Sequence, residues 1–84
     1  MQRRLVEHVE VWTYRYDSRG HRYRAFVTCN LDTTEYRWAM WEQDEHGKPV
    51  SALYEPQSRS ASLDETLAQI EEHIHASSHT TPPG

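Results

Sequence analysis

Apolar and polar residues alternate along most of the first half of the chain. Residues 5–16 are rich in the β-forming types Val, Trp, Thr and Tyr, and residues 21–31 alternate apolar side chains with Arg, Thr and Asn. A period of two is typical of a strand with one buried face, because successive side chains point to opposite faces of a sheet. The pattern predicts two strands here, joined as a hairpin by the turn residues Asp17 to Gly20.

A third and a fourth strand are predicted further along. Residues 35–42 alternate in the same way and carry a tryptophan on each face. A polar loop at 43–49, which contains glycine and proline, precedes a short apolar run at 50–54. We therefore expect a four-stranded antiparallel meander, with residues 50–54 as a short edge strand.

The last apolar pattern has the period of a helix. Ser62 followed by Glu65 is a capping box, in which each side chain bonds a backbone amide at the helix start. Apolar residues then recur at spacings that place them on one helix face: Leu63, Leu67, Ile70 and Ile74. We expect an α+β fold in which this helix, residues 62–75, packs on one face of the sheet. Residues 1–76 would form one ββββα domain, and residues 77–84 a disordered tail.

The alternation also assigns side chains to the two faces of the sheet. One set is assigned to the face under the helix: Val9, Val11, Tyr23, Ala25, Val27, Cys29, Leu31, Tyr36, Trp38 and Met40. The helix is about 10 Å wide and covers only about half of four strands, so part of this face stays open.

The opposite face has no second helix to cover it. Its set interleaves large aromatic residues with arginines: Trp12, Tyr14, Tyr16, Arg22, Arg24, Phe26, Arg37 and Trp41. Left in water, these would form a larger apolar patch than monomers usually expose, with the composition of interface hot spots. Strong twist and arginine stems could instead cover part of the aromatic rings. We predict that this set is the partner-binding surface.

Length and composition limit the possible classes of protein. The chain has 84 residues, of which 36% are hydrophobic, so there is room for one domain with a thin core. Its nine aromatic residues separate it from disordered sequences. No apolar run is long enough to span a membrane, and because residues 1–4 are not followed by an apolar run we expect no secretion signal. The single cysteine, Cys29, cannot form an internal disulfide, so we expect a soluble, cytoplasmic protein.

The net charge of −4 is unevenly distributed along the chain. Residues 1–41 hold seven arginines against five acids, a net of +2, and residues 42–84 hold two cations against eight acids, a net of −6. Such asymmetry can indicate an interaction surface. A solvent-exposed acidic helix beside a mildly basic sheet gives the same totals.

Candidates for catalysis and metal binding are three histidines and one cysteine: His73, His75, His79 and Cys29. On a helix only His75 and His79 share a face, and His79 lies in the expected tail. Cys29, with His8 or His21 as its base, would be a nucleophile, but its place in an apolar strand pattern indicates a buried thiol. Paired carboxylates, a nucleophile elbow and a glycine-rich phosphate loop are all missing from the sequence. We expect no enzymatic activity, no cofactor and no metal.

Arginines interleaved with aromatic residues also suit nucleic acid, because they can bind phosphates and stack on bases. In residues 12–16 (WTYRY) and 17–22 (DSRGHR), and in having three strands before a helix, the chain resembles the AP2-type and integrase arm-binding DNA domains. The resemblance covers residues 12–74 as an order of elements, and implies strand residues that read the major groove. Those domains are strongly basic and lack a fourth strand, whereas this chain has a pI near 5.8 and one lysine.

The sequence therefore favours a protein partner. Such a surface needs only the aromatic and arginine side chains, with the acidic helix to orient the partner. The expected function is that of a small protein-binding module, an adaptor, inhibitor or regulator of a larger protein; compact acidic proteins of this size include phage-type inhibitors. Self-association as a homodimer through the same surface is the simplest way to bury it. Binding of DNA or RNA is the alternative.

Overall fold

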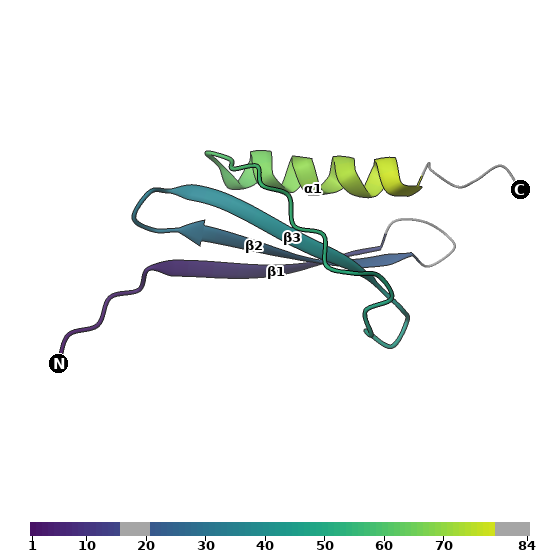
Figure 1. Cartoon of the computed structure of the whole chain (residues 1–84), viewed down its shortest axis with the longest axis horizontal. Coiled ribbons are helices and arrows are strands. Elements are labelled where there is room, and N and C mark those ends of the chain that lie inside the picture. Colours follow the sequence, from purple (N-terminus) through teal and green to yellow (C-terminus); the bar gives the residue numbers. More distant parts are fainter. Residues whose placement is uncertain (16–20, 79–84) are drawn as a thin grey trace, which may run out of the picture.

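The protein consists of a small antiparallel sheet with one helix on one side of it (Figure 1). A computed structural model describes residues 1–15 and 21–78. These residues form the strands β1 (Glu7–Arg15), β2 (Arg22–Asn30) and β3 (Glu35–Gln43) and the helix α1 (Leu63–Ser78). The strands follow one another in the order β1-β2-β3, each antiparallel to the next. The predicted α+β class, the meander order and the C-terminal helix are confirmed. The turn predicted at Asp17 to Gly20 lies outside the described residues.

The predicted fourth strand is wrong, because the sheet has three strands. The chain after β3 runs beside its outer edge and touches it at three isolated bridges, Gln43 with Pro49, Met40 with Tyr54, and Tyr36 with Ser60. Between the first bridge and the second, β3 advances by three residues, from Gln43 to Met40. The segment beside it advances by five, from Pro49 to Tyr54. These two extra residues break the regular ladder, and the proline amides cannot donate to one. Residues 49–60 therefore cover the edge of β3 without forming a strand.

The hydrophobic core lies between the sheet and α1. Its buried side chains come from β2, β3 and the helix: Tyr23, Ala25, Val27, Trp38, Met40, Ile70 and Ile74. Leu63 and Leu67 are partly buried against this cluster, so all four predicted helix residues face the sheet. Trp38 is held further by its indole N–H, which donates to Gln69 Oε1 at 3.1 Å. The core is thin, as the short chain predicts.

Ser62 caps the helix as predicted. Its Oγ accepts a hydrogen bond from the Glu65 amide at 3.1 Å, which satisfies one of the amides that the first turn leaves unpaired. Thr66, which the apolar pattern did not include, is fully buried and donates its hydroxyl to the Ser62 carbonyl at 2.8 Å. The helix continues to Ser78, so residues 77 and 78 are helical where a tail was expected.

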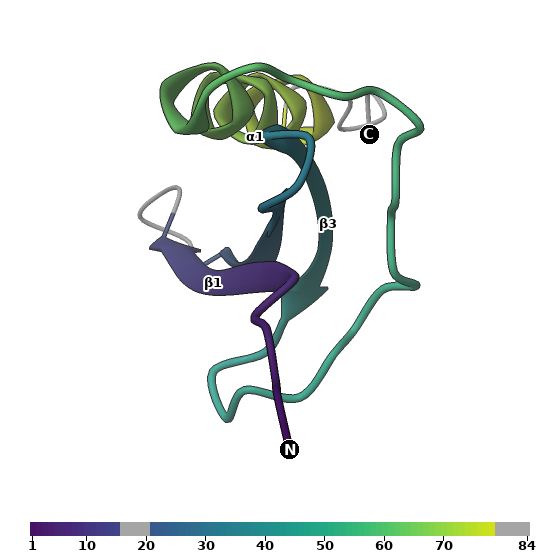
Figure 2. The same cartoon turned by 90° about the vertical axis from the view of Figure 1, so that its left-hand side faces the viewer.

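The helix covers the sheet unevenly. It packs on β3 and β2, and β1 is the strand farthest from it in both views (Figures 1 and 2). This agrees with the expectation that one helix is too narrow for the whole face. A hydrogen bond from the Tyr14 hydroxyl to Glu71 Oε2, at 3.3 Å, links β1 to α1.

The two faces of β1 are the reverse of those predicted. The register places Glu10, Trp12 and Tyr14 opposite Val27, Ala25 and Tyr23 respectively. Residues directly opposite in an antiparallel pair share a face, so Trp12 and Tyr14 point to the helix side. Val9 and Val11 point away from it and are 52% and 55% exposed. β1 carries apolar residues on both faces, and only its register with β2 determines which of them meets the core.

Candidate binding face

The sheet surface opposite α1, called the open face below, is covered by none of the described helices and strands. The two registers assign five residues of each strand to it. They are Glu7, Val9, Val11, Thr13 and Arg15 of β1, Arg22, Arg24, Phe26, Thr28 and Asn30 of β2, and Glu35, Arg37, Ala39, Trp41 and Gln43 of β3.

The centre of the open face is apolar. Val11 lies opposite Phe26, and Phe26 lies opposite Ala39 in the next strand. The Phe26 and Trp41 rings form an edge-to-face pair with centroids 5.1 Å apart and planes at 67°. With the exposed Val9 beside them, these side chains form a continuous strip across all three strands. An aromatic pair next to exposed valines is a surface that gains free energy when a partner covers it.

One end of the open face is positively charged. Arg15 and Arg22 lie directly opposite each other at the β1–β2 hairpin, and Arg24 follows along β2. Like charges in opposite positions repel, so an anionic group placed between them would be favoured. Arg22 Nη1 donates to the Glu45 carbonyl at 3.1 Å, which ties this end to the loop after β3.

Four polar atoms at the same end lack a hydrogen-bond partner within the part of the chain that the structure describes. They are Arg22 Nε, Arg24 Nε, Trp41 Nε1 and Gln43 Oε1. Arg22 lies opposite Gln43 and Arg24 opposite Trp41, so the four form one block of two rows. Shielded polar atoms without partners cost free energy. Small rotations of these half-buried side chains would let the atoms bond to a partner at this end.

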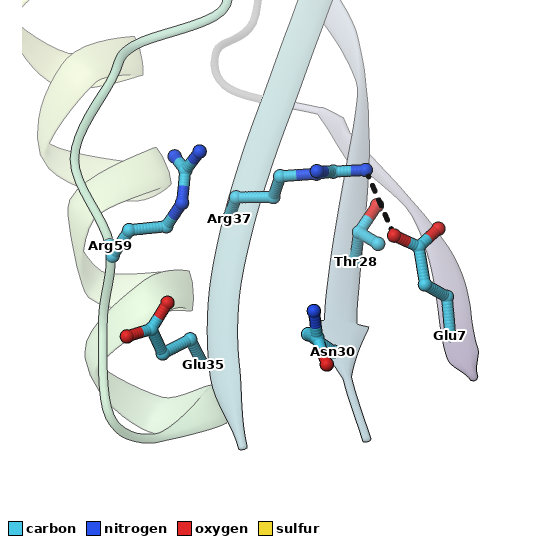
Figure 3. A pocket seen from close by; sticks show the side chains of 6 residues that line it. All are labelled: Glu7, Thr28, Asn30, Glu35, Arg37 and Arg59. Atoms are coloured by element: carbon cyan, nitrogen blue, oxygen red, sulfur yellow. Dashed lines mark hydrogen bonds and ion pairs between the residues drawn. The ribbon is translucent and has the colours of Figure 1, made fainter. Parts of the chain in front are cut away.

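The other end of the open face is polar and mixed in charge (Figure 3). The Arg37 side chain reaches from β3 across Thr28 of β2 to Glu7 of β1, where Nη2 lies 3.4 Å from Oε1. A hollow of about 250 Å³ surrounds this ion pair, lined also by Asn30, Glu35 and Arg59. Its opposite charges are balanced, so it has no strong preference for an anion or a cation.

The predicted binding residues are divided by this arrangement. The structure brings five of them together on the open face: Arg22, Arg24, Phe26, Arg37 and Trp41. Trp12 and Tyr14 lie on the helix side instead, and Tyr16 lies outside the described residues. Trp12 remains 39% exposed on the helix side of the sheet. Burial raises the pKa of Tyr14 to about 12, with the Glu71 carboxylate adding to the shift.

The predicted binding set left out Val9, Val11 and Arg15, which lie on the open face. A signal for them exists, because Val9, Val11, Thr13 and Arg15 alternate with the period of a strand. Charged side chains are rarely buried without a partner, so the presence of Arg15 in this series indicates that the valines of the same series face solvent.

Two of the candidate chemical residues, Cys29 and His8, lie on neighbouring strands. Cys29 is half-buried and lies opposite His8, but its thiol donates to the Asn30 carbonyl at 3.8 Å. A hydrogen bond with Cys29 raises the pKa of Tyr36. Among residues 1–15 and 21–78, no three His, Cys, Asp or Glu side chains are grouped to hold a metal ion. His79 lies outside these ranges.

The His73 ring belongs to an aromatic cluster on the helix side. It stacks on Tyr54 with centroids 4.0 Å apart and planes at 13°, and both rings also contact Trp38. Burial lowers the pKa of His73 below its usual value. This stacking attaches the segment 49–60 to α1, so the role of His73 is structural.

Comparison with models of protein families, with curated proteins and with solved structures found no match for this chain. In the described residues, no helix has both the length and the apolar character needed to cross a membrane.

Proposed function

We propose that this protein is a small, non-enzymatic binding module that attaches to a larger protein through its open face, as an adaptor, inhibitor or regulator. The observation that supports this most is the Phe26–Trp41 pair, which lies beside exposed valines on a sheet face that α1 does not cover. Apolar and aromatic side chains stay together at a surface in water mainly where association later hides them.

The arrangement of side chains supports a protein partner. An apolar centre of Val9, Val11, Phe26 and Trp41 is bordered by polar and charged residues at both ends of the strands. Protein interfaces have this organisation, with a dry centre and a polar rim. Trp and Arg are also the residue types that contribute most to binding free energy when a partner excludes water from them.

Charge can orient the partner. The open face carries four arginines against two glutamates, whereas α1 begins with Asp64 and Glu65 on the opposite side of the sheet. A partner with an acidic rim around an apolar centre would approach the arginine end and be repelled by the helix side. Such complementarity increases the association rate and selects the docking orientation.

The test begins with capture of a partner on the immobilised protein, from nuclease-treated lysate of the cells that naturally make it. We expect one protein to be retained at both 50 and 200 mM salt, because an interface with an apolar centre changes little between these concentrations. The purified partner is then titrated against wild type and Phe26→Ala. Loss of about 2 kcal/mol, roughly thirtyfold in affinity, is expected for a hot-spot residue. An unchanged affinity for Phe26→Ala would exclude the open face as the binding surface.

Nucleic acid remains the second candidate, and one finding favours it. The sheet has three strands before its helix, so the expected fourth strand no longer separates it from the AP2-type order of elements. The arginine end would supply the phosphate contacts, whereas the apolar centre offers only the Trp41 indole N–H as a side-chain donor for phosphate oxygens.

Binding to single- and double-stranded DNA, measured at 50 and 200 mM salt, separates the two candidates. Nucleic-acid affinity falls steeply with salt because bound arginines release counterions. Our proposal predicts no sub-micromolar binding at either salt. Sub-micromolar binding that weakens steeply with salt, and that is lost when Arg15, Arg22 and Arg24 are changed to alanine, would identify DNA as the partner in place of a protein.

A further inference from the structure

The two outer edges of the sheet differ in how they are covered. On β3, the outward backbone groups of Tyr36 and Met40 exchange hydrogen bonds with Ser60 and Tyr54 at 2.7 to 3.0 Å. Glu42 likewise accepts a bond from the Val50 amide at 2.8 Å. On β1, no described residue outside β2 pairs with the strand. The edge of β1 is therefore the uncovered edge of this sheet.

The hydrogen-bond pattern identifies which backbone groups point outward from β1. The Leu31 amide donates to the Val6 carbonyl at 3.0 Å, which makes Val6 and Leu31 a hydrogen-bonded pair. Because such pairs alternate along antiparallel strands, the even-numbered residues of β1 bond to β2. The odd-numbered residues then direct their N–H and C=O groups to the outer edge: Glu7, Val9, Val11, Thr13 and Arg15. The same alternation correctly gives Tyr36 and Met40 as outward-facing on β3.

This edge has few of the features that usually prevent strands from pairing. β1 is nine residues long, contains neither Pro nor Lys, and keeps a one-to-one register with β2 without a bulge. Glu10, on the helix side, is the one charged side chain of β1 that is half-buried. A long, straight edge of this kind is a template for another strand.

We propose that β1 pairs with β1 of a second copy of this chain, antiparallel and about a two-fold axis at Val11, so that the two sheets become one continuous sheet. This inference does not rest on the proposed function, because it uses the strand edge and leaves the open face accessible. Val11 is the midpoint of β1, so this register overlaps the strand over its whole length. It is a closed, isologous contact of the commonest oligomeric type.

Charge complementarity supports this register. With the axis at Val11, Glu7 lies opposite Arg15 of the second copy, and by symmetry Arg15 lies opposite its Glu7. Both ends of the contact therefore carry an opposite-charge pair on the open face. Glu7 holds Arg37 through Oε1, so its Oε2 atom can accept from the incoming guanidinium. A register with the axis at Glu10 would place Glu10 against its own copy, a repulsive arrangement.

The helix side of β1 also fits this register. Trp12 would lie opposite the second copy's Glu10 and diagonal to its Trp12, within the reach of aromatic side chains across a strand pair. In one chain Trp12 is 39% exposed because α1 packs on β3 and β2. The uneven cover of the helix leaves room for the two indoles, and pairing would bury both.

Charge reversal tests the register by sedimentation equilibrium. Wild type is expected to form a species of twice the 9.9 kDa chain mass. Glu7→Arg and Arg15→Glu should each weaken dimerisation roughly tenfold, because two attractive pairs become repulsive. Glu7→Arg has an arginine at both positions 7 and 15, and Arg15→Glu has a glutamate at both. When the two variants are mixed, their heterodimer therefore has an attractive pair at each end and should form as tightly as the wild-type dimer.

A backbone substitution tests the edge independently of charge. Val11→Pro removes an outward amide and leaves the β1–β2 bonds intact, so the fold should persist while dimerisation falls by roughly a hundredfold or more. Val11→Thr keeps the amide and should dimerise as wild type does. In wild type, hydrogen exchange should show protected amides at Val9, Val11 and Thr13, and Val11→Pro should release Val9 and Thr13.

Two results would overturn this inference. One is a wild-type monomer at millimolar concentration with rapidly exchanging Val9, Val11 and Thr13 amides. The other is a dimer that survives Val11→Pro but is lost in Phe26→Ala, which would place self-association on the open face. Failure of the proposed function has a different signature, since it would leave the dimer intact while Phe26→Ala has no effect on partner affinity.

Discussion

Ile70 is one of the two fully buried isoleucines through which the helix contacts the sheet. It has no exposed surface, whereas Leu67, one turn earlier, is only partly buried against the same cluster. Ile70→Ala should therefore lower the free energy of unfolding by about 2 to 5 kcal/mol, from lost burial plus the cavity left behind. Leu67→Ala should cost roughly half as much. Equilibrium denaturation of both variants measures this, and a loss below about 0.5 kcal/mol for Ile70→Ala would contradict the described packing.

His73 gives the stability of the protein a dependence on pH. Burial against Tyr54 and Trp38 lowers its pKa, so the folded state favours the neutral ring. The unfolded chain takes up a proton near pH 6.5, and the stabilisation from neutral His73 is complete above that value. It is lost as the pH falls through the lowered pKa of the folded state. We expect the melting temperature to decrease from pH 7 to pH 5.

Two variants assign this dependence to His73. His73→Phe keeps an aromatic ring on Tyr54 and removes the titration, so its melting temperature should change less between pH 7 and pH 5. His75→Ala changes a histidine of the same helix outside the ring cluster of Tyr54 and Trp38, and serves as the matched control. Glu42 lines the same hollow as His73 and is left unchanged in both variants. An identical slope in His73→Phe and wild type would assign the pH dependence to other groups.

At the scale of elements, the start of α1 depends on one side chain. Ser62→Ala removes the acceptor of the Glu65 amide and should cost about 1 kcal/mol of stability. Ser62→Asp restores an acceptor at the same position and also places a negative charge at the helix N-terminus, so it should match or exceed wild type. Chemical denaturation compares the two variants. Equal stability of the alanine and aspartate variants would show that the cap contributes nothing.

Local patterns were sufficient to predict most of the elements. The alternation of β2 and β3 and the Ser62 cap of α1 are encoded within a few residues each, and each is where it was expected. The helix face was also predictable, because the period of Leu63, Leu67, Ile70 and Ile74 needs no knowledge of its partner.

The fourth strand and the faces of β1 depend on tertiary structure. The segment 49–60 carries two extra residues between successive bridges, a mismatch with β3 that no local pattern reveals. In β1, Val9 and Val11 alternate with Trp12 and Tyr14, so both faces contain apolar residues. The register with β2 and the position of α1 over β2 and β3 decide which face is covered.

At the scale of the whole molecule, two surfaces of different character lie on opposite sides of the sheet. The open face combines an apolar centre with arginines, and the exposed side of α1 is acidic. If the second copy adds its strands at β1, the two open faces become one broader surface with an arginine group near each end. A partner with matching repeats would then bind through two sites at once, with an affinity greater than that of one site.

The central claim, that the open face binds the partner, is tested most directly by comparing two tryptophans. Trp41 lies in the open face, and Trp12 lies on the opposite side of the same sheet, so the alanine variants remove the same side chain from different faces. The measurement is the affinity of the purified partner for the monomer of each folded variant, so that a change in pairing through β1 does not contribute. Our account predicts a loss of roughly thirtyfold or more for Trp41→Ala and a change within about threefold for Trp12→Ala. Equal losses, or a larger loss for Trp12→Ala, would contradict it.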